Sequence, residues 1–166
     1  MPDGIVCIGA GGHAKVCVEL LVAGGATVAY CISGAQAPPT LLGIPVLEGD
    51  EHLERLVRMG YSEVFVAIGD NRVRERIGRQ AVQLGYRLVN AISPEATVSP
   101  SARVGSGVAI MAGVVINAAA DIGDLVVVNT GASIDHDCVI GTAAHIAPKS
   151  TLCGNVRVGE RSFVAA

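Results

Sequence analysis

The 166-residue sequence contains no tryptophan, and aromatic residues make up only 3% of it. Charged residues are also few, at 16%, whereas apolar residues reach 51%. A core without large rings has to be filled by small and β-branched side chains, which suits thin, regular layers. The low charge and the high apolar content exclude a disordered chain and indicate a substantial core.

The sequence also lacks the marks of several functional classes. A net charge of −3 gives no indication of binding to nucleic acid or to an anionic membrane. Five scattered cysteines without a CxxC pair indicate reduced thiols, not a disulfide framework or a zinc site. No signal-peptide pattern is present, and the uncharged run 104–120 is broken by glycines and shorter than a membrane span of roughly 20 residues. We therefore expect a cytoplasmic protein with no metal.

The first half alternates short apolar runs with helical patterns, and 33–49 is expected to be a proline-rich loop. We predict strands at 4–10, 26–32, 63–69 and 87–92, and helices at 11–25, 50–60 (opened by Asp50) and 70–85. Strands separated by helices predict a parallel sheet with right-handed crossovers.

After about residue 90 the helical periodicity stops, and a branched aliphatic residue occupies every sixth position. These residues are Ile92, Val98, Val104, Ile110, Ile116, Ile122, Val128, Ile134, Ile140, Ile146, Leu152, Val158 and Val164. This period predicts a hexapeptide-repeat parallel β-helix, in which three hexapeptides form one triangular coil and each aliphatic side chain stacks on the residue eighteen positions later. A β-sandwich, the alternative, would show irregular turns. Glycine follows the aliphatic residue at 105, 123, 141 and 159, where we expect tight corners.

Asp135, His136 and Asp137 form a titratable cluster inside the otherwise small and apolar stretch NTGASIDHDCVIG (129–141). An imidazole can accept a proton near neutral pH, and a carboxylate beside it can fix the tautomer. The alternative is a solvated loop histidine. No further ligand set indicates a metal site.

A glycine-rich turn, IGAGGHAKV (8–16), follows the first predicted strand, where phosphates would meet a helix N-terminus. It departs from GxGxxG and lacks the acidic residue of nicotinamide enzymes, so an ordinary tight turn is the alternative. Asp70 and Asn71 come at the end of the third predicted strand. If the sheet is parallel, they face the same crevice as the glycine-rich turn. They either contact the nucleotide or cap the following helix.

The stretches IGAGGHAKV, VAIGDN (66–71) and NTGASIDHDCVIG resemble bacterial nucleotide-sugar N-acetyltransferases with a left-handed β-helix, the group that includes sialic acid O-acetyltransferases and bacillosamine N-acetyltransferases. The resemblance implies a Rossmann-like α/β domain that binds the nucleotide sugar, residues 1–90. An all-β left-handed parallel β-helix of hexapeptide repeats follows at 91–166, and we expect it to be truncated because the register still runs at its end. Relatives often have acidic residues after the second strand, but this sequence reads CISGAQ (31–36) there.

The resemblance also implies a function: acetyl-CoA-dependent N-acetylation of the 4-amino group of a nucleotide-linked 4-amino-4,6-dideoxysugar by a homotrimer, with direct transfer in a ternary complex. Family members that acetylate GDP-perosamine look most similar, and UDP-linked sugars are near alternatives. Two alternative functions also remain: a sugar O-acetyltransferase of the sialic-acid type, and a non-catalytic β-helix subunit that binds a nucleotide sugar.

By the same resemblance His136 is the general base and Asp137 its acidic neighbour. Acetyl-CoA is expected to contact His145, Gly154 and Ala166. Residues expected to contact the nucleotide sugar are Gly9, Gly11, Gly12, His13, Ala14, Lys15, Gly69, Asp70, Asn71 and Asn129.

Overall fold

The computed structural model describes residues 3–34 and 36–165. The chain forms two compact units, Met1–Val89 and Asn90–Ala166.

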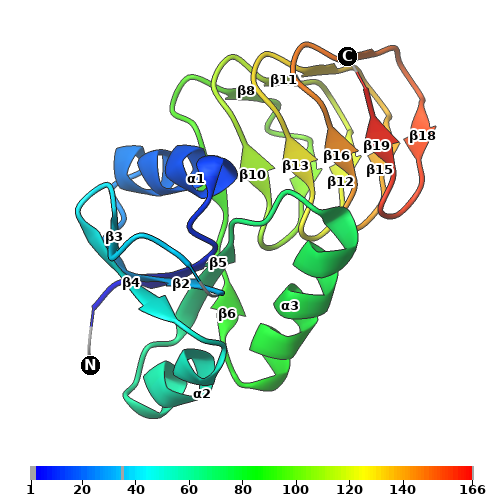
Figure 1. Cartoon of the computed structure of the whole chain (residues 1–166). Helices are drawn as coiled ribbons and strands as arrows, with labels where there is room; N and C mark the ends of the chain where they lie inside the picture. Colours follow the sequence, from blue (N-terminus) through cyan, green and yellow to red (C-terminus); the bar gives the residue numbers. More distant parts are fainter. Residues whose placement is uncertain (1–2, 35, 166) are drawn as a thin grey trace. The chain divides into compact units, whose positions relative to one another are not determined.

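The N-terminal unit is built on a six-stranded sheet with the strand order β3-β4-β2-β1-β5-β6 (Figure 1). Its strands are β1 (Ile5–Ile8), β2 (Val28–Ser33), β3 (Thr40–Leu41), β4 (Ile44–Glu48), β5 (Glu63–Val66) and β6 (Arg87–Leu88), and its helices are α1 (Gly12–Ala23), α2 (Glu51–Arg58) and α3 (Asn71–Gln83). Every pairing is parallel except that of β3 with β4. All four residues of β1 are buried, as expected for a central strand of a parallel sheet. The predicted Rossmann-like α/β architecture is confirmed.

The sheet has a topological switch point at β1. From β1 the chain passes through α1 to β2 on one side, whereas β5 pairs with β1 on the other side. The carboxyl ends of β1 and β5 therefore lie together, at the place where open α/β sheets usually bind ligands. Gly9 is required here, because its φ is +125° and an added Cβ would lie 2.5 Å from the carbonyl oxygen of Ala67.

Some local predictions for this unit were wrong. The expected loop 33–49 contains the β3–β4 hairpin, whose two-residue turn has positive φ at Leu42 (51°) and Gly43 (81°). The expected strand 87–92 is two strands in different sheets, β6 and the first strand of the C-terminal unit. The prediction that Asp50 opens the second helix is confirmed, since Asp50 is the N-cap residue of α2, although its side chain caps no backbone N–H of that helix.

The C-terminal unit is a left-handed parallel β-helix of two-residue strands in three sheets (Figure 1). The first sheet contains β7 (Ala91–Ile92), β10 (Ala109–Ile110), β13 (Val127–Val128), β16 (His145–Ile146) and β19 (Phe163–Val164). The second contains β8 (Thr97–Val98), β11 (Val115–Ile116), β14 (Ser133–Ile134) and β17 (Thr151–Leu152), and the third β9 (Arg103–Val104), β12 (Asp121–Ile122), β15 (Val139–Ile140) and β18 (Arg157–Val158).

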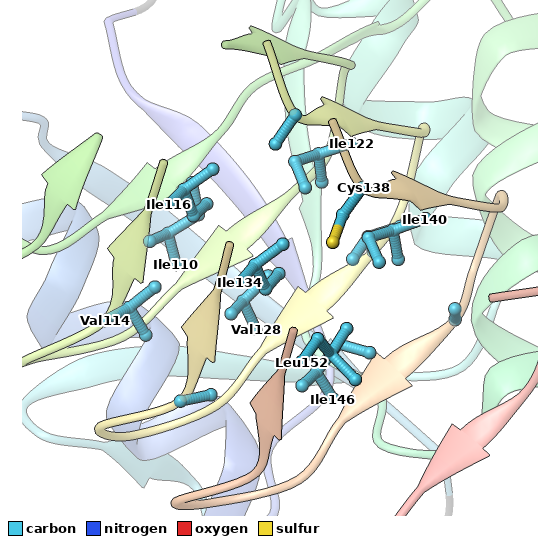
Figure 2. Packing of buried hydrophobic residues seen from close by; sticks show 14 of the residues in the cluster. Ile110, Val114, Ile116, Ile122, Val128, Ile134, Cys138, Ile140, Ile146 and Leu152 are labelled. Atoms are coloured by element: carbon cyan, nitrogen blue, oxygen red, sulfur yellow. The ribbon is translucent and has the colours of Figure 1, made fainter. Parts of the chain in front are cut away.

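The aliphatic residues stack inside the β-helix at the predicted spacing of eighteen. Ile110 pairs with Val128 and Ile116 with Ile134, and Ile122 pairs with Ile140. Figure 2 shows these side chains together with Val114 and Cys138, gathered in the interior. Each fully buried isoleucine stabilises the coil by about 1.5–3 kcal/mol. The stack loosens at its start, where Ile92 is 38% exposed.

Left-handed backbone recurs at every sixth residue from 107 to 161, once at each corner. The ten residues are Gly107, Gly113, Ala119, Leu125, Gly131, Asp137, Ala143, Lys149, Asn155 and Arg161, with φ between 56° and 72°. A left-handed conformation costs a non-glycine residue roughly 1–2 kcal/mol. The corner N–H groups return part of this cost by bonding to the previous coil, as Asn155 does to the carbonyl oxygen of His136 at 2.8 Å.

The prediction that tight corners require the repeat glycines was therefore wrong. Gly105, Gly123 and Gly141 lie before the left-handed residues and have no positive φ. They are needed because adjacent coils approach closely: an added Cβ at Gly123 would lie 2.9 Å from the carbonyl oxygen of Ile140. Close approach of backbones is the constraint at these three positions.

Replacing Gly123 by alanine is expected to lower the free energy of unfolding by about 1–3 kcal/mol, because the added methyl group forces two coils apart. Gly159→Ala is the matched control, since an added Cβ there meets only the Ser162 hydroxyl oxygen, at 3.5 Å. The control should change stability by less than about 0.5 kcal/mol. Chemical denaturation of both variants checks this, and equal losses would contradict it.

Candidate active site

His136 and Asp137 lie at the corner between β14 and β15, where the hydrogen-bonding geometry fixes the imidazole. His136 Nδ1 is 2.8 Å from Asp137 Oδ2. A carboxylate oxygen can only accept, so Nδ1–H donates and Nε2 is the unprotonated nitrogen of the neutral ring. The side chains are 59% and 61% exposed, so a ligand can reach this nitrogen.

The pKa of His136 lies above its ordinary value because protonation strengthens its hydrogen bond to Asp137, and the charge of Asp135 adds to this effect. Asp135 Oδ1 accepts the backbone N–H of His136 at 2.8 Å and the Asn117 side-chain amide at 3.0 Å. These two hydrogen bonds lower the pKa of Asp135, so its carboxylate remains charged. Asn117 lies one coil earlier and ties the cluster to the body of the β-helix.

Gly154, one coil after His136, lies directly against the imidazole ring. A Cβ added at Gly154 would be 2.5 Å from both Cε1 and Nε2 of His136. The absence of a side chain at Gly154 therefore determines where the ring can lie. This contact accounts for a glycine at this position whether or not its backbone also contacts a cofactor.

Asn129, at the corner after β13, and His145, on strand β16, form a second polar pair. Asn129 Oδ1 accepts the backbone N–H of Thr130 at 2.8 Å, which turns its Nδ2 toward His145 Nε2 at 3.1 Å. Because Nδ2 can only donate, Nε2 of His145 accepts, and the neutral ring carries its proton on Nδ1. The His145 ring also packs edge-on against Phe163, with ring centroids 5.0 Å apart.

The predicted acetyl-transfer residues thus form two separate groups on one β-helix. His136, Asp137 and Gly154 meet at the corner after β14, whereas Asn129 follows β13 and pairs with His145 of β16. Ala166 lies outside the described residues. These assignments of function stay predictions.

The glycine-rich turn of the N-terminal unit leads into α1 at the switch point. Gly11 is the N-cap of α1, and the first helical hydrogen bond runs from the Lys15 N–H to the Gly11 carbonyl. The N–H groups of Gly12, His13 and Ala14 belong to the first turn, which has no intrahelical acceptor for them. The Ala14 side chain is fully buried, so only its backbone is suited to contact a ligand.

His13 and Asn71 both make contacts within the unit. His13 Nε2 lies 3.5 Å from the sulfur of Cys17, and burial raises the pKa of that thiol to about 12. Asn71 Oδ1 accepts from Nη2 of Arg74 at 2.8 Å.

Asp70 caps α3 by accepting the N–H of Val73 at 2.9 Å. Capping was one of its two predicted roles; a contact with nucleotide stays a prediction.

Three polar residues of these sites were not singled out from the sequence. Asn117 supports Asp135, Thr130 orients Asn129, and Arg74 lies fully buried beneath the loop after β5. The eighteen-residue register could have placed Asn117 beside Asp135. Nothing in the charged sequence of α3 distinguishes Arg74 from its exposed neighbours.

Some other features contribute no site residue. An apolar pocket of about 610 Å³ lies between α1 and the β3–β4 hairpin, lined by residues such as Val18, Val22, Leu42 and Ile44, none of which was predicted to bind a ligand. Across residues 3–34 and 36–165, no group of three or more His, Cys, Asp or Glu is arranged to hold a metal ion. In the same ranges no helix combines the length and apolar character needed to cross a membrane.

Known proteins share the fold of this chain. Residues 4–81 match the PglD N-terminal domain family. PerB from Caulobacter crescentus, solved in complex with CoA and GDP-perosamine, is 55% identical over 98% of this chain and 77% of that chain, with a TM-score of 0.94. The acetyltransferase domain of PglB from Neisseria gonorrhoeae, solved with acetyl coenzyme A, is 39% identical over 99% of this chain and 80% of its own, with a TM-score of 0.89. WeeI from Acinetobacter baumannii, at 17% identity and a TM-score of 0.62, shares the fold.

A Rossmann-like unit joined to a hexapeptide β-helix with an exposed corner histidine defines the class of β-helix acyltransferases. The chain belongs to the family of bacterial nucleotide-sugar N-acetyltransferases that includes PerB and the PglB acetyltransferase domain. It is an acetyl-CoA-dependent acetyltransferase.

Replacing Asp137 by asparagine is expected to lower the pKa of His136, because the carboxylate that favours the imidazolium is lost. The corner should persist, since asparagine tolerates left-handed backbone. The stability that wild type has over the variant should be fully present below the ordinary pKa of histidine and should vanish as the pH rises through the raised pKa. NMR titration of the imidazole checks the shift, with His145 as internal control. An unchanged His136 titration would contradict the assignment.

Proposed function

We propose that the protein transfers the acetyl group of acetyl-CoA to the 4-amino group of GDP-perosamine. The observation that carries the choice of substrates is the 55% identity, across both units, to an enzyme solved with CoA and GDP-perosamine. The exposed His136–Asp137 pair supplies the base that such a transfer needs.

The chemistry follows from the tautomer of His136. The sugar amine attacks the thioester carbonyl, an amide bond forms, and the carbon–sulfur bond breaks. Nε2 of His136 accepts the proton that the amine loses, and Asp137 stabilises the resulting imidazolium. The proton then passes to the CoA thiolate. No acyl-enzyme is needed, so both substrates are bound together.

The N-terminal unit binds the nucleotide through its switch-point loops. Gly9, Gly11 and Gly12 permit close approach, and the N–H groups in the first turn of α1 suit phosphate oxygens. The side chains of Lys15 and Asp70 are exposed beside these loops. The sugar is expected to lie near Asn129.

We further propose a homotrimer in which each active site combines two subunits. The support is that His136 lies at the corner after β14, whereas the Asn129–His145 pair joins the corner after β13 to strand β16. A single convex prism offers no long groove for an extended pantetheine arm, but two prisms side by side do. Threefold closure makes three equivalent grooves, each with His136 from one subunit and His145 from its neighbour.

We assign the reaction to the cytoplasm. The supporting observation is that Cys7, Cys17, Cys31, Cys138 and Cys153 are free thiols in the described structure.

A substrate panel tests the proposed function. Release of free thiol from acetyl-CoA is measured with GDP-perosamine, a UDP-linked 4-amino sugar and a sialic acid. The highest kcat/KM is expected for GDP-perosamine. Preference for the UDP-linked sugar or for a hydroxyl acceptor would assign the other branch of the family, and nucleotide-sugar binding without thiol release would indicate a non-catalytic subunit.

Replacing His136 by asparagine is expected to lower kcat by roughly 10²–10⁴, the usual contribution of a general base. The fold should persist because the side chain projects from a corner. Both substrates should still bind, as CoA and GDP-perosamine do in the Caulobacter crescentus enzyme after one histidine is replaced by asparagine. Saturation kinetics measure the loss, and an unchanged kcat would refute the role of His136.

Mixing subunits tests the shared site. Co-expressing His136→Asn chains with His145→Ala chains should restore some activity, because one mixed interface joins an intact His136 to an intact His145. Each variant alone, expressed in the same way, is the control. If mixed trimers form but are no more active than the separate variants, the two histidines serve one site within a single subunit.

A further inference from the structure

We propose that Arg74 is a positioning residue for nucleotide binding: its buried guanidinium holds the carbonyl groups of Ile68 and Gly69, which directs the N–H groups of Gly69 and Asp70 toward acceptor oxygens of the nucleotide. This inference rests on the proposed function, because it requires that the N-terminal unit binds the nucleotide sugar.

Arg74 differs from the other arginines of α3. Arg72, Arg76 and Arg79 are exposed, whereas Arg74 is fully buried. Burial lowers the pKa of Arg74 to about 10, so the side chain is still charged at neutral pH. Burying a cation is costly unless hydrogen bonds and opposite charges compensate for the lost water. An apolar side chain would fill the same space without this cost, so the contacts of Arg74 indicate its role.

Those contacts converge on the loop that follows β5. Nη1 donates to the carbonyl oxygen of Ile68 at 2.9 Å and to that of Gly69 at 3.0 Å. Nη2 donates to Oδ1 of Asn71 at 2.8 Å, which steadies the guanidinium. Two consecutive carbonyl groups of one exposed loop therefore point at a single buried cation.

The direction of these carbonyl groups fixes the direction of two N–H groups. The peptide bonds are trans, so the N–H of Gly69 points away from the Ile68 carbonyl and the N–H of Asp70 away from the Gly69 carbonyl. Both residues are exposed, and in the described part of the chain neither N–H donates a hydrogen bond. The loop lies at the switch point, where β5 ends beside β1. Arg74 thus acts from beneath the loop without touching the ligand.

Arg74→Lys and Arg74→Met test this role, with Arg76→Met as the control on the exposed side of the same helix. A lysine keeps the charge but lacks the planar fork that holds two carbonyl groups. Because hydrogen bonds to a charged acceptor are affected, KM for GDP-perosamine should rise roughly 10-fold or more in both Arg74 variants. The kcat and the KM for acetyl-CoA should stay near wild type. A merely structural role would lower the melting temperature without this selective rise in KM.

Backbone amide NMR of the ¹⁵N-labelled full chain, titrated with GDP, separates the outcomes. Binding should shift the Gly69 and Asp70 amide signals in wild type and in Arg76→Met, and much less in Arg74→Lys. If wild type shows neither turnover of any nucleotide sugar nor amide shifts in the N-terminal unit, the proposed function fails. If wild type is active but folded Arg74→Lys retains the KM and the shifts, the role of Arg74 is refuted. Should neither Arg74 variant fold, the wild-type titration decides: shifts at Gly69 and Asp70 support the inference, and their absence overturns it.

Discussion

Backbone pairing between residues eighteen apart is the constraint on which the β-helix and its polar corners depend. A two-residue strand has no stability of its own, and it persists here because the same face of the next coil accepts its hydrogen bonds and covers its aliphatic side chain. In each strand the inward-facing position is occupied by an aliphatic side chain of the interior. The polar cluster around His136 lies at a corner, where Asn117 and Gly154, one coil before and one coil after, hold it in place.

The N-terminal unit holds its polar groups in place in a different way. Its sheet supplies loops at the carboxyl ends of β1 and β5, and the groups that we propose for nucleotide binding there are mainly backbone N–H groups. Backbone donors have no rotamers, so their aim depends on what holds the opposite side of the peptide. Gly9 allows the two loops to approach closely, and the buried guanidinium of Arg74 anchors the second loop from below.

Periodic features were predictable from the sequence, whereas features that depend on a single close contact were not. The interior of the β-helix followed from the six-residue repeat, because a strict period leaves one face available for aliphatic residues. The roles of Gly105 and Gly123 did not follow, since their need arises from the next coil and not from local backbone. The hairpin turn at Leu42 lacks the usual Asn-Gly signal, and the burial of Arg74 is hidden in an otherwise polar helix. His136 and Asp137 were predictable as a pair, but the limit that Gly154 sets on the ring is purely spatial.

The β-helix has two structural periods: six residues for its interior and eighteen residues for the polar contacts around His136. For the interior, the hexapeptides from residue 107 onward are equivalent, because each places one aliphatic side chain inside and one left-handed residue at a corner. For the site, only whole coils are equivalent, since Asn117, Asp135 and Gly154 meet through an eighteen-residue spacing. A change of length by six residues between Asn117 and Asp135 would keep the core filled but rotate the histidine to another edge of the prism. Insertion of one hexapeptide is therefore expected to preserve the stacked interior, whereas only insertion of a whole eighteen-residue coil preserves the contacts around the histidine.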